Sequence, residues 1–472
     1  MSDPARSLRG SRIPEDRPAE PPLSEPAAEA WIPRTCFKKG PPRRLGVELE
    51  LLVGGLGPDG LATHFPRHRY PQLITALHGG PSSLDGRLTV EPGGQVELSS
   101  RPGPDLPRTV DTVHRDLTLL RHRARTCGVR LIGAGLDPTR SPRRISDEPR
   151  YAAMERYFRP WGSTGPAMMC STASVQVNVE AYTSAGGPAD RWELLHAIGP
   201  ALVAAFANSP RRDGRPTGFR STRQAVWQVL DPARTTAPPR RPDEDPATAY
   251  TRWALDAPVM LIRRDGPDWS APRGLSFRGW LRHGRGAVPD RPPPTLDDLA
   301  YHLTTLFPPV RARGHLEVRY LDAQPGCWWI VPTAVLAALL DDPRAADRAR
   351  AACDPIRGRW LEAARFGVAD PALAQAATAV LGAGADSLRD DAGTMRFADQ
   401  VERYLDRWTL RGRSPADDPP GTATAEHACD EDGAVPPAGP VRPPVGTGGE
   451  RVDRSGSCAA GRPGIIRREA TA

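Results

Sequence analysis

Two glutamates stand close together in the first segment with strand character, residues 45–53. Because side chains alternate between the two faces of a strand, Glu48 and Glu50 should share one face, ~7 Å apart, with apolar neighbours on the other. Carboxylates at this spacing are suited to holding divalent cations, since Mg²⁺ and Ca²⁺ take oxygen ligands. For two glutamates alone, a sheet with one solvated face is the simpler interpretation.

A second acidic group surrounds a Pro-Gly-Gly turn in residues 90–100. The turn brings Glu91 near Gln95 and Glu97. A three-residue or bulged loop would place all three side chains on one face, whereas a two-residue loop would turn Glu91 away from Glu97. The sequence leaves this register open.

Two further segments alternate in the same way and carry polar side chains on one face. One offers Gln176 and Asn178, and the other offers Glu317 and Arg319. Rows of facing carboxylates would repel one another without cations. Carboxylate-bound Mg²⁺ commonly also holds substrate phosphates, and guanidinium forks match phosphate oxygens. We therefore predict an antiparallel sheet whose polar face binds a magnesium-bridged nucleotide triphosphate.

Several apparent motifs do not fit the chemistry that they suggest. Gly55–Gly60 matches a dinucleotide-binding glycine pattern, but Pro58 and the lack of a following helix indicate a loop. His64 and His68 have the spacing of a zinc pair, but Pro66 would break the helix that such a pair needs. A Walker A motif is excluded, because the only two lysines stand side by side near the amino terminus.

The bulk composition favours an ordinary solvated surface. The 472 residues carry a net charge of +7, but 63 basic and 56 acidic residues are interspersed without a long basic block. An arginine-rich nucleic-acid-binding protein is therefore the weaker alternative. Seven cysteines without a Cys-x-x-Cys motif argue for a reducing compartment. With no secretory signal and no bilayer-spanning apolar run, we expect a cytoplasmic protein without membrane or nucleic-acid partners.

The chain divides into one domain and two tails. Residues 1–40 and 413–472 are rich in Pro, Ala and charged residues with little apolar periodicity, and should be disordered. Residues 41–412 contain the strand segments and several helical patterns, one of which opens at Thr295 with Asp298 placed for a capping box. This pattern predicts an α+β domain.

Several blocks of this domain resemble the glutamate-cysteine ligases of plants and many bacteria. In order along residues 43 to 345 they are Leu88–Ser99, Arg150–Met154, Met168–Asn178, Phe206–Pro210, Gly218–Trp227, Tyr250–Met260 and His302–Arg311. The resemblance implies a glutamine-synthetase-like catalytic domain, an open antiparallel sheet backed by helices. It also implies ATP- and Mg²⁺-dependent joining of glutamate to the amine of cysteine through a γ-glutamyl phosphate.

The same resemblance implies roles for individual residues. The metal carboxylates would be Glu48, Glu50, Glu91, Glu97 and Glu317. Gln176 and Asn178 would contact the nucleotide or the metal. The glutamate site would include Met169, Thr172, Arg223 and Trp227. Arg234 and Arg319 would be catalytic arginines that face the phosphates.

The chain also departs from the plant pattern, at Gly46–Glu50 and at Tyr320–Ala323, which leaves the pocket for the thiol substrate open. Its Arg-, Ala- and Pro-rich composition is more like that of an actinobacterium, where such enzymes are similar to the ergothioneine-pathway ligase, so we favour that member over a glutathione-pathway one. A ligase of the same fold that uses another amine is the main alternative.

Overall fold

The computed structural model describes residues 21–40, 44–56, 62–80, 82–182, 188–241 and 243–419. All of them belong to one compact unit. Disorder is predicted for residues 1–20 and 420–472, which lie outside the described residues. Most of the glycine-rich loop Gly55–Gly60 also lies outside them.

The predicted tail boundaries need correction at both ends. Residues Glu25–Cys36 form helix α1, although the sequence predicts disorder for 1–40. The helix packs on α10 and α11 and buries Ile32 completely. At the other end Ser414 is fully buried, so ordered structure continues past residue 412. Composition is a poor guide here, because a segment rich in Pro, Ala and charge can still bury one apolar stripe.

An antiparallel sheet organises the fold. Among the described residues it has eight strands, in the order β3-β4-β1-β6-β10-β9, with β2 and β5 paired to the carboxyl-terminal half of β1. The strands are β1 (Leu45–Leu56), β2 (Ala62–Thr63), β3 (Arg87–Val90), β4 (Val96–Ser99), β5 (Val129–Ile132), β6 (Ser174–Val179), β9 (Val310–Ala312) and β10 (Leu316–Asp322). A separate hairpin pairs β7 (Arg211–Arg212) with β8 (Arg215–Pro216). The predicted open antiparallel sheet is confirmed.

Strand register places the polar residues on one face. Glu48 on β1 lies opposite Ser99 on β4 and Gln176 on β6, while Glu50 lies opposite Glu97 on β4. Cross-strand partners point to the same side of a sheet. The polar side chains of three neighbouring strands therefore share one face, and the alternating Val and Leu residues take the other.

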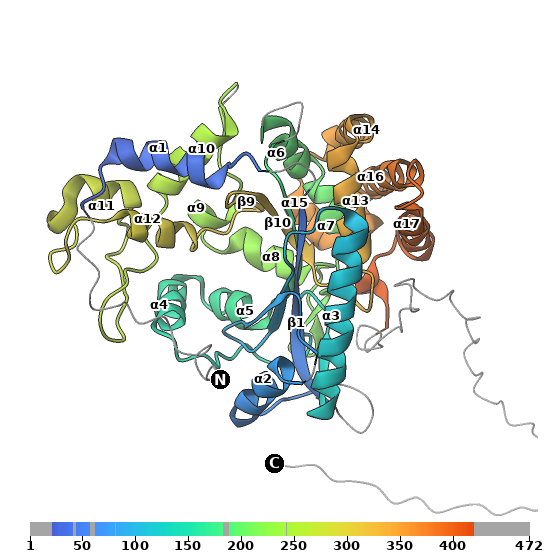
Figure 1. Ribbon diagram of the computed structural model, residues 1–472, viewed down its shortest axis with the longest axis horizontal. Coiled ribbons are helices and arrows are strands. Elements are labelled where there is room, and N and C mark those ends of the chain that lie inside the picture. Colours follow the sequence, from blue (N-terminus) through green and yellow to red (C-terminus); the bar gives the residue numbers. More distant parts are fainter. Residues whose placement is uncertain are drawn as a thin grey trace, which may run out of the picture. The chain divides into compact units, whose positions relative to one another are not determined.

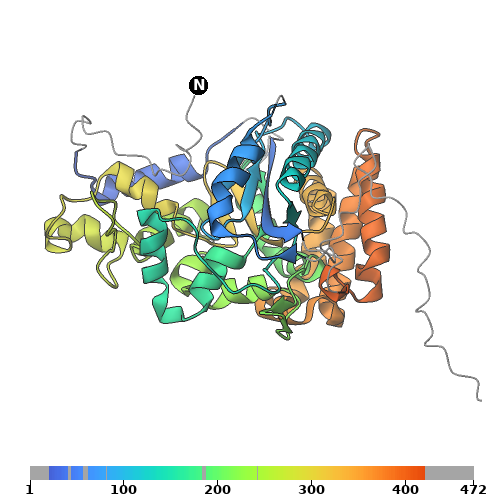
Figure 2. The same ribbon diagram turned by 90° about the horizontal axis from the view of Figure 1, so that it is seen from below.

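Helices pack around the sheet on both sides. They are α2 (Tyr70–His78), α3 (Leu106–Thr126), α4 (Pro149–Tyr157), α5 (Thr164–Ser171), α6 (Pro188–Ala197), α7 (Gly199–Ala205), α8 (Thr222–Val229), α9 (Pro232–Thr235), α10 (Pro246–Asp256), α11 (Phe277–His283), α12 (Leu296–Leu303), α13 (Ile330–Asp341), α14 (Pro343–Cys353), α15 (Trp360–Phe366), α16 (Pro371–Arg389) and α17 (Met395–Arg407). α3 packs on β1 and β5, and α13 packs on α3 and β6 (Figure 1). α14, α16 and α17 pack around α13 as a further layer (Figure 2).

A smaller group of helices lies on the other side of β1. α4, α5 and α8 surround a separate apolar core that includes Met154, Phe158, Met168 and Leu230 (Figure 1). The predicted capping box at the start of α12 is confirmed, since Thr295 and Asp298 exchange side-chain and backbone hydrogen bonds. Of the helices in the described part of the chain, none has the length and apolar character needed to cross a membrane.

The tight approach of the β3–β4 turn to α5 gives a test of this packing. A Cβ atom at Gly93 would lie 2.2 Å from the carbonyl oxygen of Cys170 and 2.4 Å from its Cα. Backbone atoms cannot rotate away, so we expect Gly93→Ala to lower the free energy of unfolding by ~1–3 kcal/mol. Urea denaturation followed by circular dichroism measures this change.

Gly382 in α16 supplies the matched control. A Cβ there meets nothing within 4 Å. Gly382→Ala should therefore raise the free energy of unfolding by ~0.5–1 kcal/mol, because alanine loses less backbone freedom in a helix. A Gly93→Ala protein as stable as the wild type would contradict the close approach.

Candidate active site

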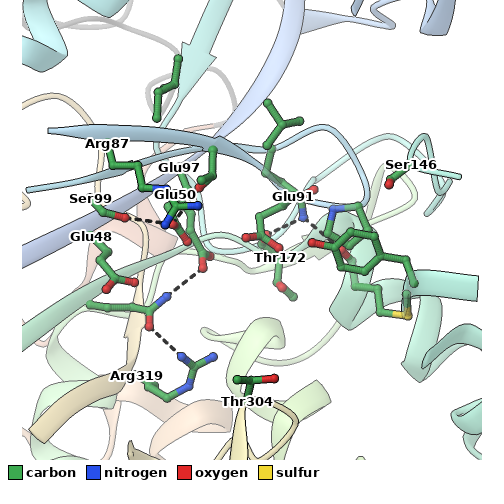
Figure 3. A pocket seen from close by; sticks show the side chains of 18 of the residues that line it. Glu48, Glu50, Arg87, Glu91, Glu97, Ser99, Ser146, Thr172, Thr304 and Arg319 are labelled. Carbon is green, nitrogen blue, oxygen red and sulfur yellow. Dashed lines mark hydrogen bonds between the residues drawn. The ribbon is translucent and has the colours of Figure 1, made fainter. Parts of the chain in front are cut away.

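The polar face of the sheet lines a cavity of about 1200 Å³ (Figure 3). Strands β1, β3, β4 and β6 contribute its floor, and α2, α4, α5, α8, β9 and β10 contribute its walls. Ten predicted site residues line it: Glu48, Glu50, Glu91, Glu97, Met169, Thr172, Gln176, Arg223, Trp227 and Arg319. The structure does not bring Asn178, Arg234 or Glu317 to its surface.

Facing carboxylates lie at the centre of the floor. Glu50 and Glu97 are direct cross-strand partners, and like charges in this position destabilise a sheet. Hydrogen bonds offset part of the repulsion. Gln176 Nε2 donates to Glu50 Oε1 at 2.8 Å, and the hydroxyls of Thr89 and Ser99 each donate to Glu97 Oε1 at 2.9 Å.

Asn178 orients the third carboxylate from beside the cavity. Its Nδ2 donates to Glu48 Oε1 at 3.1 Å. Its Oδ1 is buried and has no hydrogen-bond partner within the described part of the chain. Buried acceptors are rarely left without a donor. A cation bound beside this oxygen and the Glu48 carboxylate would supply the missing partner.

Loop length brings Glu91 into the same group. The backbone N–H of Glu91 donates to the carbonyl of Gln95 at 2.8 Å, which leaves three residues in the β3–β4 loop. Glu91, Gln95 and Glu97 therefore share a face, as the three-residue alternative predicts. Gln95 Nε2 also donates to the carbonyl of Thr172 at 2.9 Å, which ties the hairpin to the end of α5.

Burial raises the pKa of these carboxyls. The pKa of Glu48 is raised to about 7, first by burial and then by the charges of Glu317 and Glu97. Burial and then Glu97 and Glu50 raise the pKa of Glu91 to about 8, and burial and Glu97 also raise the pKa of Glu50. Burial and like charges disfavour only the ionised form. The described residues contain no preassembled cluster of three or more metal-ligating side chains.

Glu317 has a different environment from the one that the sequence predicts. Its carboxylate is fully buried and accepts hydrogen bonds from Arg311, Arg313 and Arg319. Burial opposes its ionisation, but the three guanidinium groups overcome this and hold the pKa of Glu317 below its usual value. The structure thus places Glu317 away from the surface of the cavity, where it anchors arginines that face the cavity.

A relay of hydrogen bonds connects this arginine group to the carboxylates. Arg319 donates to Glu317 and, at 2.7 Å, to Gln176 Oε1, while the amide nitrogen of Gln176 donates to Glu50. The two charged groups are thus held in register across β1, β6 and β10. Figure 3 shows Arg319 at one end of this relay and Glu50 at the other.

Arg223 enters the cavity from the first turn of α8. Ser221 caps this helix, and the hydroxyls of Ser209 and Ser221 both donate to the buried carboxylate of Asp322. Arg223 Nη2 donates to the carbonyl of Arg319 at 2.7 Å. Its Nε and Nη1 are buried and make no hydrogen bond in the described residues, although Nη1 lies 3.8 Å from Asp322 Oδ1. Two unsatisfied guanidinium donors beside a cavity indicate an anionic ligand.

The remaining predicted substrate residues form the wall between α5 and α8. Met169 and Thr172 lie at the end of α5, and Trp227 lies one turn after Arg223 on α8. The Trp227 ring packs 5.5 Å from Phe307. The wall is therefore apolar and aromatic next to the carboxylate floor.

Arg234, predicted to face the phosphates, does not line the cavity. A guanidinium group has five N–H donors. All five are used, by the Asp231 carboxylate, by the Thr305 carbonyl and hydroxyl, by the Tyr157 hydroxyl and by the Pro258 carbonyl. Arg234 is fully buried and has no donor left for a phosphate. It joins α9 to its neighbours and is a structural residue.

Some cavity residues were not identified from the sequence. They include Arg87, Arg150, Tyr151, Thr304, Phe307 and Arg311. The alternation of arginine with small residues in Val310–Arg313 was a usable signal for β9. Arg150 and Thr304 stand in blocks that resemble the ligase family, but the sequence does not show that they meet, because their contact forms only in the tertiary fold.

Comparisons with known proteins agree with this geometry. Residues 44–423 match the model of glutamate-cysteine ligase family 2 (GCS2). The chain is 39% identical over 427 residues to glutamate-cysteine ligase EgtA of Mycolicibacterium smegmatis, covering 89% of this chain and 95% of the relative. It is 37% identical over 428 residues to EgtA of Mycobacterium tuberculosis, with the same coverage.

A more distant likeness extends to plants. The chain is 35% identical over 255 residues to the chloroplastic glutamate-cysteine ligase of Medicago truncatula, which covers 53% of this chain and 49% of the relative. The family match and the near full-length alignments are independent of the geometry of the cavity. They show that the chain belongs to glutamate-cysteine ligase family 2.

Proposed function

We propose that the protein joins the γ-carboxylate of L-glutamate to the amine of L-cysteine through γ-glutamyl phosphate. In the first step the carboxylate attacks the γ-phosphorus of ATP and ADP leaves. In the second step the cysteine amine attacks the acyl carbon, the bond from that carbon to the phosphate oxygen breaks, phosphate leaves, and the nitrogen gives up a proton as the amide forms. The observation that carries the proposal is the meeting of carboxylates from β1 and β4 with arginines from α8, β9 and β10 in one cavity.

The residues present fit Mg²⁺. Glu48, Glu50 and Glu97 supply hard carboxylate oxygens, and the unsatisfied Oδ1 of Asn178 lies beside Glu48. Glu91 extends the carboxylate row toward α5 and would serve a further cation. When bound, Mg²⁺ would neutralise the triphosphate and relieve the repulsion between the facing carboxylates. Glu317 is left out of this set because three arginines already occupy it.

The arginines of the chain supply fixed positive charge. Arg319 is held by Glu317 and Gln176, so its guanidinium does not need to reorganise when charge develops on the phosphoryl oxygens. Arg223 keeps two donors for a substrate carboxylate, and Trp227 borders the same region. Phosphoryl transfer to a carboxylate needs this alignment and neutralisation rather than a covalent enzyme nucleophile.

The protein's setting follows from the same proposal. We infer a cytoplasmic location, because the reaction consumes ATP. We further infer that the product enters ergothioneine biosynthesis. The 37–39% identity to the EgtA proteins over 89% of the chain supports this assignment.

Product identification decides between cysteine and another amine. The protein is incubated with glutamate, Mg-ATP and one amine at a time, and the products are identified by mass spectrometry while ADP release is measured. We expect γ-glutamylcysteine and a stimulation of ADP release by cysteine. Stimulation by a different amine only, with no γ-glutamylcysteine, would favour the alternative ligase.

Glu97→Gln should remove most of the activity while leaving the fold intact. The amide keeps the size of the side chain but loses the charge that would hold the cation, so we expect kcat/KM to fall at least ~100-fold. Calorimetry then measures whether the variant has lost Mg²⁺-dependent nucleotide binding. Glu362→Gln, on the exposed surface of α15, is the control, and a Glu97→Gln protein with unaltered binding would refute the assignment.

Arg223→Ala should mainly impair the capture of glutamate. Removing a guanidinium group that binds a substrate carboxylate costs on the order of 1.5–3 kcal/mol of binding free energy, so KM for glutamate should rise about 10- to 100-fold. Steady-state kinetics with saturating ATP and cysteine measures this. Arg365→Ala, on the exposed side of α15, should leave KM at the wild-type value. An unchanged KM in Arg223→Ala would argue against a glutamate carboxylate at this position.

The raised pKa values of Glu48 and Glu91 predict that the cation-free protein loses stability as pH rises. Their pKa values are about 7 and about 8 in the folded state, against 4.5 ordinarily. The folded state therefore binds more protons than the unfolded chain above pH 4.5, and the free energy of unfolding falls through pH 7 and 8. From pH 7 to 8.5 in EDTA we expect a loss of about 1–2 kcal/mol.

Two measurements separate this effect from other titrations. Added Mg²⁺ should reduce the loss, because a cation favours the ionised carboxylates. Glu91→Gln cannot ionise and should flatten the dependence. Denaturation curves at the two pH values provide the data, and a wild-type protein that gains stability on going to pH 8.5 would contradict the raised pKa values.

A further inference from the structure

Arg150 is a cavity residue to which the proposed chemistry gives no role. It is the second residue of α4 and is half-buried at the cavity wall. Its Nη1 donates to the Thr304 hydroxyl at 3.0 Å and its Nη2 donates to the Thr304 carbonyl at 3.2 Å. The guanidinium also lies 5.1 Å from the centre of the Tyr301 ring. These contacts from α12 fix the plane of the fork.

Arg150 forms no salt bridge within the described part of the chain, although its charge acts on the nearby carboxyls of Glu91 and Glu148. The other arginines of the cavity either face a carboxylate (Arg67, Arg223, Arg311, Arg313 and Arg319) or lie exposed at the rim (Arg87 and Arg101). The two bonds to Thr304 use two of the five guanidinium donors and leave three. A half-buried, preoriented guanidinium with free donors is a receptor for an anion, most simply a carboxylate.

The wall beside Arg150 is apolar and contains sulfur. Met154 lies four residues further along α4, on the same face of the helix as Arg150. Met168 of α5 and Tyr151 also line the cavity, and both methionines are 6% exposed. Methionine adapts its shape to a small ligand and makes favourable contacts with polarizable groups. A guanidinium group that can bind a carboxylate, next to such a wall, fits a small amino acid with a polarizable side chain.

The cavity therefore contains two separate forks, and the proposed reaction has two amino-acid substrates. Arg223 on α8 is bonded to the backbone of Arg319, so its free donors lie next to the phosphate-facing arginine. This is the position for the glutamate that becomes phosphorylated. Arg150 is held by Thr304, which Figure 3 shows across the open space from Glu91 and Thr172. The second fork is thus available to the substrate that arrives after phosphorylation.

We propose that Arg150 binds the α-carboxylate of the acceptor amino acid and that Met154 and Met168 contact its side chain. Held in this way, the acceptor is oriented with its amine toward the acyl phosphate, which converts an encounter into an aligned attack. Arg150 is a binding and positioning residue and takes no part in proton or phosphoryl transfer. The inference rests on the proposed ligation and deepens it by naming the receptor for the second substrate.

A cycle that changes the enzyme and the substrate together tests the proposal. The four combinations are wild type or Arg150→Met with cysteine or with cysteamine, the amine that lacks the carboxylate. We expect the wild type to prefer cysteine, and Arg150→Met to reduce the ratio of kcat/KM for cysteine to kcat/KM for cysteamine at least about tenfold. KM for cysteine should rise, whereas KM for glutamate should stay within about twofold of wild type.

Two further variants separate binding from folding. Arg150→Lys keeps the charge but not the fork and should recover only part of the ratio. Arg159→Met, at an exposed position just after the end of α4, is the matched control and should keep the wild-type ratio. Circular dichroism and thermal melts confirm that each variant is folded before kinetics are compared.

The results separate the role of Arg150 from the ligation reaction itself. Equal losses with cysteine and cysteamine, or a rise in KM for glutamate only, would overturn the role of Arg150 while the ligation itself stands. If the wild type uses another amino acid and not cysteine, the proposed function is wrong. The same cycle with that amino acid and its decarboxylated analogue then decides on Arg150.

Discussion

The opposition of Glu50 and Glu97 across β1 and β4 is the constraint on which the site depends. Antiparallel pairing fixes the two carboxylates on one face, where burial and mutual repulsion work against their ionised forms. Donors on the neighbouring strands stabilise the two carboxylates. Gln176 on β6 donates a hydrogen bond to Glu50, and Thr89 on β3 donates one to Glu97. These donors position the carboxylates but do not neutralise them, so a need for positive charge is built into the fold.

At the other edge of the sheet, a buried carboxylate holds a group of arginines in place. Glu317 gathers three guanidinium groups at the β9–β10 hairpin and keeps Arg319 directed at the cavity. Arg234 uses the same chemistry for structure alone, since all of its donors are taken by backbone and side-chain acceptors. The number of donors left free therefore separates the arginines that can bind a ligand from those that hold the fold.

The sequence predicts the face of each strand because alternation is a local property. Glu48, Gln176 and Arg319 follow that rule and line the cavity. It could not decide the β3–β4 register, which depends on the hydrogen bond from Glu91 to Gln95. Nor could it separate Glu317 from the other carboxylates, because the arginines that surround it come together only when β9 pairs with β10. Helix α1 was missed because composition does not record its burial against α10 and α11.

The strand order has a consequence for synthesis of the chain on the ribosome. β1 lies in the middle of the sheet, yet its partner β6 follows after more than a hundred residues, and β10 follows β6 at a similar distance. Pairings this remote in sequence slow folding and leave strand edges uncovered in the meantime. A nascent chain arrested before β10 would expose one edge of β6, where chaperones could bind and where aggregation could begin.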